Sequence, residues 1–296
     1  MITPGYLALH AGPSRGARDV ALLDVCQDYV LDFLNIQGVF DLGVVLKGGT
    51  SLRKFRAGSA GRFSTDLDFS VPDVATAELV IDTLDGAEHH GVRFIVGARE
   101  TLRAVLRFDT PLGEPAIATK LELSSRPLWL PRQMAPPIAL PVHKAYEFTL
   151  PALPVPAIEE AIAEKLAAWR RRRKMRDLYD LFWFGQGVLD EVLIRRLFVV
   201  KVWNDVVRDG LGNAPLEPAE VIADLDLRRL PQEDIGLLTQ PVEPRTWLNF
   251  VRERYRFVLD LVADEERVAR CNPGDDYFVR QMEDELTRWE AAGGDA

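Results

Sequence analysis

Hydrophobic and polar positions follow a helical period near the start of the chain. Residues 18–34 carry apolar side chains at the spacing of one helix face, and an aspartate recurs at every fourth position of the opposite side: Asp24, Asp28 and Asp32. This pattern predicts an outer helix whose apolar side packs against the rest of a domain. Residues 75–85 have a similar pattern, and we expect them to form a helix that covers the same domain.

A strand and a glycine turn are predicted between these helices. Residues 42–49 form a short apolar run that ends in two glycines, which is typical of a buried strand that meets a tight turn. The next segment favours a helix that begins near Thr50 or Ser51, because hydroxyl side chains are frequent at helix N-termini.

Residues 62–71 predict a strand with two acids on one face. Leu67 and Phe69 alternate with Asp66 and Asp68, so the apolar and the acidic side chains point to opposite faces. The two carboxylates would then lie about 7 Å apart along the strand. Like charges repel each other if that face is enclosed, and a cation between them would remove the repulsion.

Three further segments predict strands: residues 92–97, 102–109 and 117–124. Arg103 and Arg107 fall on a common side of the second segment, and the third places Glu122 between two leucines. Together with the predicted helices, these strands indicate an α+β fold with a mixed or antiparallel sheet and flanking helices.

The second half of the chain has a different character. Eight prolines lie between residues 127 and 156; they exclude a long helix and predict a crossing segment around one strand near residues 146–150. From residue 157 onward the patterns are mostly helical, including an unbroken one over residues 244–271 and a last helix near 276–291. We therefore expect a first domain over residues 1–150 and a mainly helical domain over residues 151–296.

Composition limits what these domains can do. The chain is 47% hydrophobic with a net charge of −9, which predicts a folded protein and argues against nonspecific coating of nucleic acid. It has no run long enough to span a membrane and no signal-peptide pattern at its N-terminus, so a cytoplasmic location is expected. Cys26 and Cys271 are predicted to pack in the core. The four histidines, including the adjacent His89 and His90, lack zinc-site spacing, so surface or structural roles are expected and a metal would have oxygen ligands.

The predicted acids suit a divalent metal. Hard carboxylate oxygens favour Mg²⁺, which keeps waters and substrate phosphates as its remaining ligands. Asp66 and Asp68 are the first candidate ligands, and Glu122 on a neighbouring strand is the third. The turn at Gly48 and Gly49 would let backbone amides approach triphosphate oxygens, together with two nearby hydroxyls, those of Thr50 and Ser51.

The motifs Lys-Gly-Gly-Thr-Ser-Leu-Arg-Lys-Phe (residues 47–55) and Arg-Phe-Ser-Thr-Asp-Leu-Asp-Phe (residues 62–69), with the block at residues 163–184, resemble the AbiEii/AbiGii nucleotidyltransferase toxins. These MenT-like toxins belong to the DNA polymerase β-like nucleotidyltransferase superfamily. The resemblance spans roughly residues 40–185. It implies a nucleotidyltransferase-type mixed sheet followed by a helical domain, dependence on Mg²⁺, and transfer of a nucleoside monophosphate from an NTP.

The block at residues 163–184 also carries candidate site residues. Lys165 falls at the edge of an apolar helix stripe and is predicted to point inward, where its ammonium needs an anionic partner. That partner could be a triphosphate, a nearby carboxylate, or solvent reached by a snorkelling side chain. The resemblance favours the triphosphate. For Asp180 the spacing favours an ordinary surface ion pair with Arg176, whereas the resemblance favours a second catalytic acid that orients Lys165 or an acceptor group.

A basic run overlaps this block. Residues 165–176 hold seven basic side chains and no acid, which indicates either a surface that meets a polyanion or a solvated helix face. The candidate RNA-binding residues are Arg170, Arg172, Arg173 and Lys174. Trp169 is predicted to lie in the core and not to stack on a base.

The sequence thus favours a nucleotidyltransferase toxin that modifies the 3′ acceptor end of tRNA and blocks aminoacylation and translation; this acceptor and the toxicity are what the resemblance implies. The partners would be an NTP, tRNA and a cognate antitoxin, with no membrane. Two alternatives remain open. The same fold could transfer the nucleotide to a protein side chain or a small molecule, or the chain could be a nucleotide-binding pseudoenzyme.

Overall fold

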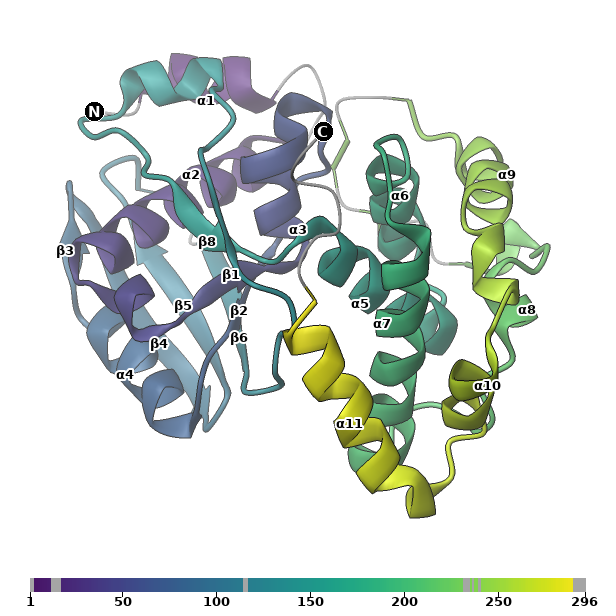
Figure 1. The fold of residues 1–296 in the computed structure, drawn as a ribbon. Coiled ribbons are helices and arrows are strands. Elements are labelled where there is room, and N and C mark those ends of the chain that lie inside the picture. Colours follow the sequence, from purple (N-terminus) through teal and green to yellow (C-terminus); the bar gives the residue numbers. More distant parts are fainter. Residues whose placement is uncertain are drawn as a thin grey trace, which may run out of the picture. The chain divides into compact units, whose positions relative to one another are not determined.

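The computed structural model describes residues 3–11, 17–113, 117–230, 235, 237–238 and 241–289. Its contacts divide the chain into two compact units (Figure 1). Unit 1 comprises Met1–Pro127, Arg132–Pro156 and Gly236–Pro241, and unit 2 comprises Leu128–Pro131, Ala157–Ile235 and Val242–Ala296. The chain therefore passes between the units at several points, and each unit is described by itself below.

Unit 1 contains a six-stranded sheet with the strand order β1-β2-β6-β5-β4-β3. Its strands are β1 (Val45–Lys47), β2 (Asp66–Ser70), β3 (Glu88–His89), β4 (Val92–Glu100), β5 (Arg103–Asp109) and β6 (Ile117–Ser124). Only β2 and β6 pair in parallel; the other neighbours are antiparallel. The sheet is thus mixed, and the predicted α+β fold is confirmed.

Helices cover one face of this sheet. They are α2 (Ala17–Ile36) and α4 (Val74–Leu84), with α1 (Pro4–Ala11) packed on α2 (Figure 1). Strand residues that face these helices are buried and join them in one core, among them Leu67, Phe69, Phe94, Leu106 and Leu121. On the opposite face of β4, β5 and β6, polar side chains alternate with the buried ones and are exposed.

Two local expectations for unit 1 are corrected. The helix after the glycine turn, α3 (Gly48–Leu52), begins at the glycines and not near Thr50 or Ser51, and it continues as a π-helical turn, η2 (Arg53–Ala57). The strand expected near residues 146–150 does not form. Instead β7 (Gln133–Ala135) and β8 (Leu153–Val155) pair as a separate two-stranded sheet. Short 3-10 turns complete the unit: η1 (Val39–Leu42), η3 (Gly58–Ala60) and η4 (Pro141–Ala145).

The polar side of α2 is buried as well, which the helical pattern did not indicate. Asp24 and Asp28 are each 1% exposed. Lys54 of η2 places its Nζ 3.0 Å from Asp24 Oδ1 and 2.7 Å from Asp28 Oδ1, and Arg53 Nε lies 3.2 Å from Asp24 Oδ1. Burial alone would raise the pKa of Asp24, but Lys54 and Arg53 hold that pKa well below its usual value.

Histidines contact the same acidic side of α2. His10 Nε2 lies 2.7 Å from Asp24 Oδ2, and His143 Nε2 lies 3.6 Å from Asp28 Oδ2, which also accepts a hydrogen bond from the Tyr146 hydroxyl. The structural role expected for the histidines therefore fits these two. Both cysteines are free and buried, as predicted.

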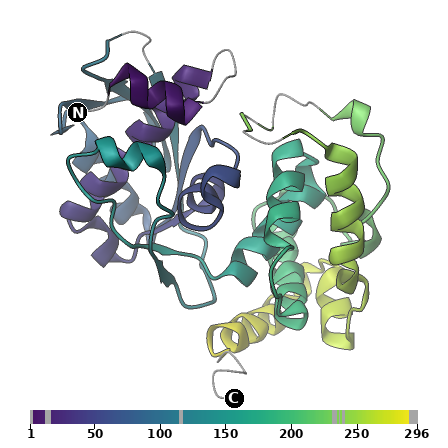
Figure 2. The ribbon, with the colours of Figure 1, turned by 90° about the horizontal axis from the view of Figure 1, so that it is seen from above.

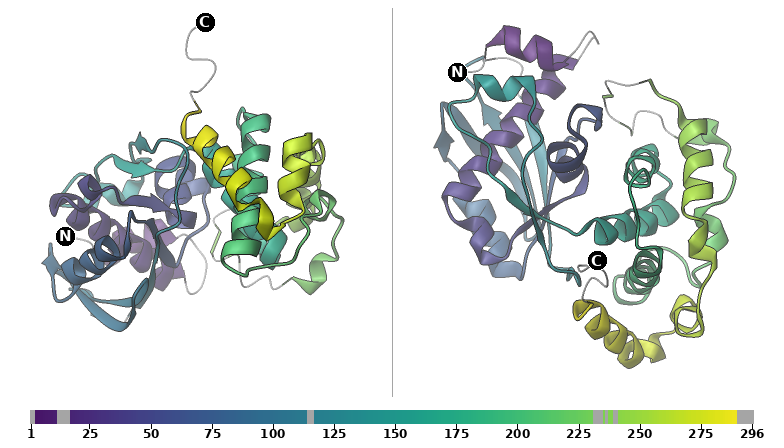
Figure 3. Two further views of the ribbon diagram at one scale, coloured as in Figure 1. Left: turned by 60° about the horizontal axis from the view of Figure 1, so that its bottom comes forward. Right: turned by 45° about the horizontal axis from the view of Figure 1, so that its top comes forward.

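Unit 2 is mainly helical. Its helices are α5 (Ile158–Arg172), α6 (Met175–Phe184), α7 (Glu191–Trp203), α8 (Pro218–Val221), α9 (Pro244–Arg254), α10 (Ala263–Ala269) and α11 (Asp276–Thr287), joined by the short turns η5 (Asn204–Arg208), η6 (Leu227–Arg229), η8 (Arg256–Leu259) and η9 (Pro273–Asp275). α5 packs on α6 and α7, α6 on α9, and α7 on α10 (Figures 2 and 3). Trp169 is fully buried in this unit, as predicted.

The continuous helix suggested for residues 244–271 is broken into α9, η8 and α10. Tyr255 at the first break is fully buried, and its hydroxyl donates a hydrogen bond to the Leu181 carbonyl at 2.8 Å. A new helix starts where the Val262 amide donates to the Glu265 side chain at 3.1 Å. Tertiary contacts and a local cap thus override a continuous helical pattern.

Candidate active site

The acids predicted on strands share one face of the unit 1 sheet. β2 and β6 pair in parallel with Asp68 beside Glu122 and Asp66 beside Lys120. Their intervening residues Leu67 and Leu121 are fully buried, so the acids project from the opposite face. Asp66 and Asp68 are half-buried and Glu122 is exposed. Three carboxylates from two adjacent strands therefore share one face of the sheet.

The glycine pair lies against this acidic face. Gly48 has a φ of +73°, and a Cβ there would lie 2.0 Å from Asp68 Oδ2. A Cβ at Gly49 would lie 2.3 Å from a guanidinium nitrogen of Arg62, which is itself buried. Only glycine allows the turn to have this conformation and lets Asp68 and Arg62 approach its backbone so closely. Arg62 is the first residue of the motif at residues 62–69, but it was not among the candidate site residues.

The hydroxyls after the glycines are buried. Thr50 is 0% exposed, and its Oγ1 donates a hydrogen bond to the Asp66 carbonyl at 2.6 Å. This bond ties α3 to β2 at the first acid. Ser51 is buried beside it. Thr50 therefore fixes the position of the acids relative to the glycine turn, in addition to any contact with a nucleotide.

The donor set of this face fits Mg²⁺. It consists of carboxylate oxygens alone, and the turn at Gly48 leaves one side of Asp68 close to backbone. Within the described residues, Asp66, Asp68 and Glu122 do not bring three ligand atoms within 4.8 Å of one another. A bound ion would accordingly take fewer ligands from the protein and complete its shell with waters and phosphate oxygens, as Mg²⁺ usually does.

A second group of ionised side chains lies in unit 2. Lys165 of α5 places its Nζ 2.8 Å from Asp180 Oδ2 and 3.4 Å from Asp177 Oδ1, and both acids come from α6. The Lys165 side chain is 13% exposed, and both aspartate side chains are fully buried. Lys165 does point inward, as predicted. The surface ion pair expected from spacing for Asp180 is wrong, because Asp180 is buried and binds Lys165.

Arg172 completes this group. Its Nε and one terminal nitrogen each donate a hydrogen bond of 2.7 Å to Asp177. Burial would raise the pKa of Asp177, but Lys165 and Arg172 lower it to about 2. Two cations thus balance two buried carboxylates, and Lys165 has a carboxylate partner within the chain.

Comparison with known proteins shows the family of the chain. A family model described as the nucleotidyl transferase AbiEii toxin of type IV toxin-antitoxin systems matches residues 32–269. The chain belongs to the AbiEii family. It is a nucleotidyltransferase, and as the toxin of a type IV toxin-antitoxin system it has a nucleotide substrate and an antitoxin partner.

One solved structure supports the same family relationship. MenT4, a nucleotidyltransferase toxin from Mycobacterium tuberculosis H37Rv, is 45% identical to this AbiEii chain, with a TM-score of 0.92 over 97% of this chain and 99% of that one. JHP933 from Helicobacter pylori is 17% identical, with a TM-score of 0.48 over 89% of this chain and 97% of that one. A search of the curated proteins found no match. None of the described helices is long and apolar enough to cross a membrane.

The basic run of this AbiEii chain makes contacts inside unit 2. Arg170 donates hydrogen bonds to the carbonyls of Asn213 and Pro215, and Arg171 pairs with Asp205 at 2.9 Å. Arg173 donates to the Glu220 carbonyl and stacks over the Trp169 ring; burial lowers its pKa. Together with Arg172 on Asp177, each of the four consecutive arginines has a partner in the unit. RNA binding by Arg170, Arg172, Arg173 and Lys174 stays a prediction, and these contacts limit how many donors are available for it.

Other cations lie on the open face of the unit 1 sheet. Arg107 of β5 and Lys120 of β6 are exposed, and they occupy diagonal positions because Arg107 pairs with Ala118 and Val105 pairs with Lys120. Lys120 is also the direct neighbour of Asp66. The sequence placed Arg103 and Arg107 on one side of a strand, but the nonlocal pairing of β5 with β6 decides that Arg103 lies opposite Glu122 and Arg107 opposite Ala118.

Proposed function

We propose that this AbiEii toxin transfers a nucleoside monophosphate from an NTP to the 3′ acceptor end of tRNA, with Mg²⁺ as cofactor, and thereby blocks aminoacylation and translation. One observation carries the proposal: acids suited to Mg²⁺ and exposed cations suited to an RNA backbone share one open sheet face in unit 1. We place this activity in the cytoplasm, where NTPs and tRNA are found.

The acids and the glycine turn would bind the nucleotide. Asp66 and Asp68 would hold the metal, with Glu122 assisting from β6. The chemistry that Mg²⁺ supplies when bound is neutralisation of the phosphates and activation of the attacking hydroxyl. The backbone amides of Gly48 and Gly49 would approach the triphosphate, with Thr50 and Ser51 fixing the turn from the buried side.

Lys165 is proposed to contact the triphosphate. Its ammonium has three donors, and Asp180 and Asp177 orient it at 2.8 and 3.4 Å. Asp180 would thus act by positioning Lys165. Attack of the RNA 3′ oxygen on the α-phosphorus would form a phosphodiester and release pyrophosphate. The partly exposed Lys165 would stabilise the charge that develops on the leaving phosphates.

The RNA acceptor is supported by the open face more than by the basic run. The basic run holds the candidate RNA-binding residues of the sequence, but its arginines have partners within unit 2. Arg107 and Lys120 are exposed, and no side-chain ion pair of theirs is found within the described residues. Neighbouring cations on the sheet face that carries the acids suit consecutive phosphates of one strand.

Label transfer tests the proposal. The protein would be incubated with Mg²⁺, bulk tRNA and each α-labelled NTP in turn, with an Asp66→Ala/Asp68→Ala variant as the inactive control. We expect label on tRNA from one preferred NTP, and none with the control. Label on a protein band would support the alternative acceptor. NTP binding without any transfer would support the pseudoenzyme.

A charge-reversed pair tests the RNA surface separately. We expect Arg107→Glu/Lys120→Glu to raise the tRNA concentration needed for half-maximal transfer at least tenfold, and to reduce its salt dependence. Arg18→Glu/Lys144→Glu makes the same change of charge at exposed positions on the helical side of unit 1 and should leave tRNA binding nearly unchanged. Equal effects of both variants would exclude the open face as a specific RNA surface.

A further inference from the structure

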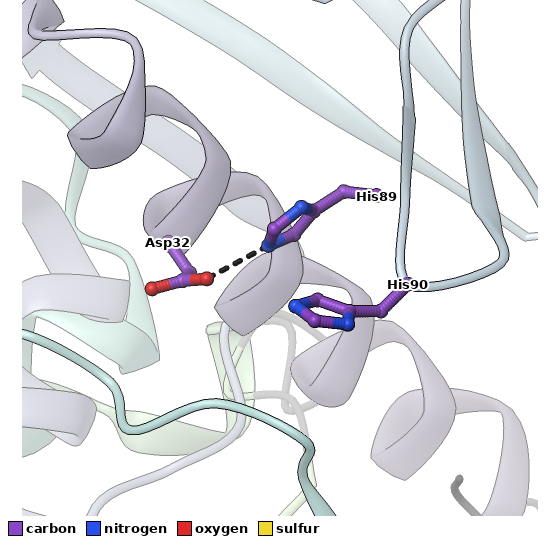
Figure 4. A group of neighbouring side chains, drawn as sticks. All are labelled: Asp32, His89 and His90. Atoms are coloured by element: carbon purple, nitrogen blue, oxygen red, sulfur yellow. Dashed lines mark hydrogen bonds and ion pairs between the residues drawn. The ribbon is translucent and has the colours of Figure 1, made fainter.

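Asp32, His89 and His90 form a compact group of metal-binding side chains outside the acids of β2. One ligand atom from each residue lies within 4.8 Å of the other two (Figure 4). His89 Nε2 is 2.7 Å from Asp32 Oδ2, and the two imidazole rings are 4.3 Å apart between centroids. The group is therefore close enough for one ion to reach all three residues after small side-chain movements.

The fold brings these residues together from separate elements. Asp32 lies on α2, and the histidines end β3 and begin the turn into β4. His90 has a φ of +47°, an uncommon conformation for a residue other than glycine, and it turns the second imidazole toward the first. The sequence shows only two adjacent histidines, because their third partner lies far away along the chain. The expectation of oxygen ligands for any metal rested on the spacing of the histidines in the sequence, and that spacing does not show that Asp32 lies beside them.

Asp32 differs from the other acids of its helix. Asp24 and Asp28 both contact Lys54, whereas Asp32, with a side chain only 7% exposed, has just His89 as an ion-pair partner among the residues described. A buried carboxylate without a permanent cation is costly. A divalent ion bound to Asp32 would supply the charge that Lys54 supplies to the other two.

The surroundings of His90 fit an imidazole ligand. Glu147 Oε2 lies 3.5 Å from His90 Nδ1, which leaves Nε2 as the nitrogen free to bind an ion. A carboxylate on the remote nitrogen is the usual second partner of a metal-bound histidine. Phe148 stacks on His90 with a centroid distance of 5.4 Å, and Tyr29 packs edge-on against both imidazoles. These rings restrict the rotation of the two histidines.

We propose that Asp32, His89 and His90 bind a transition-metal ion of the Zn²⁺ class. Two imidazole nitrogens and one carboxylate oxygen suit Zn²⁺, with water in a fourth position, and they suit Mg²⁺ poorly. The ion would take the place of the proton between His89 and Asp32 and fasten the β3–β4 turn to α2. This site does not depend on the proposed acceptor or on the acids of β2.

Zinc titration of the metal-free, tag-free full chain tests the site. Calorimetry and thermal unfolding would be measured with Zn²⁺ for the wild type, Asp32→Asn and His90→Gln. His143→Gln is the matched control, because His143 contacts another acid of α2 but lies outside the group. We expect one Zn²⁺ per wild-type chain, an affinity at least tenfold lower in both site variants, and an unchanged affinity in the control.

The design separates true binding from folding defects. Circular dichroism without metal identifies any variant that fails to fold, and a Co²⁺ visible spectrum of the wild type reports nitrogen and oxygen ligands directly. The Asp66→Ala/Asp68→Ala variant should bind Zn²⁺ as the wild type does. The proposal is overturned if the wild type binds no Zn²⁺, or if folded His90→Gln binds it with wild-type affinity.

Discussion

Two regular aspartate repeats in unit 1 have different surroundings in the folded protein. On α2 the aspartates recur every fourth residue and are buried, and Asp24 and Asp28 are paired with Lys54 inside the protein. On β2 Asp66 and Asp68 recur every second residue, stay half-buried, and project from the open face of the sheet beside Glu122. The first repeat supports the fold, and the second is placed to bind something from solvent.

This difference shows that spacing alone does not identify a functional acid. Asp24 and Asp28 have internal cations, because η2 carries Lys54 and Arg53 into the core directly after the glycine turn. The continuous segment of α3 and η2 therefore links the two repeats. Gly48 of α3 leaves room for the Asp68 side chain, and Lys54 of η2 pairs with Asp24 and Asp28. An acidic repeat becomes a candidate site when its charge remains open to a ligand from outside.

The largest expected effect comes from removing the internal cation. Lys54→Met should lower the free energy of unfolding by about 3–5 kcal/mol, because it leaves two buried carboxylates without their shared ammonium. Urea unfolding measures this loss. Lys120→Met removes an exposed lysine from the same unit and should change stability by less than about 0.5 kcal/mol. Similar losses in both variants would contradict the distinction between the repeats.

Removing an acid of the open face should affect transfer and leave the fold intact. Asp68→Ala is expected to lower the rate of nucleotide transfer by at least about 10²–10³-fold, the size seen when one electrostatic contact with a transition state is lost. The melting temperature should stay close to that of the wild type, because one of two repelling carboxylates has been removed. A large fall in thermal stability would mean that Asp68 stabilises the fold. Asp28→Ala is the comparison variant, and its melting temperature should be lower than that of the wild type.

For the buried acids of unit 2, the comparison concerns the dependence of stability on pH. The pKa of Asp177 is lowered from 3.8 to about 2, so its contribution to stability is complete above about pH 4 and is lost as the pH falls toward about 2. Integrated over that window, the shift corresponds to about 2 kcal/mol. We expect the difference in unfolding free energy between wild type and Asp177→Asn to shrink by this amount on acidification. A difference that is independent of pH would mean that Asp177 is not ionised within its pair.

Much of the fold could be predicted from sequence, because the signals are local. Alternation over residues 62–71 and 117–124 is enough to place Asp66, Asp68 and Glu122 on the strand faces that point away from the core, and the helical stripe of α5 is enough to turn Lys165 inward. The roles of these residues in catalysis stay predictions until transfer is measured.

The failures have a common physical cause, which is that partners distant in sequence decide them. A helical period shows that Asp24 and Asp28 share a side, but it cannot show that Lys54 will cover that side. The basic run shows charge, but not the carbonyls that accept from Arg170 and Arg173. Likewise, the strand near residues 146–150 failed to form because pairing of β7 with β8 selects which extended segment becomes a strand.

The chain passes between the two units several times, and this limits how the gene segments that encode them can be inherited separately. Leu128–Pro131 belongs to unit 2 although unit 1 surrounds it in sequence, and Gly236–Pro241 returns to unit 1, where the Leu237 carbonyl accepts a hydrogen bond from the Phe63 amide. No single cut in the gene would therefore separate the two units from each other. The sheet that carries the candidate acids is therefore not encoded as one continuous stretch with the rest of its unit, and the two units are expected to have been transmitted together.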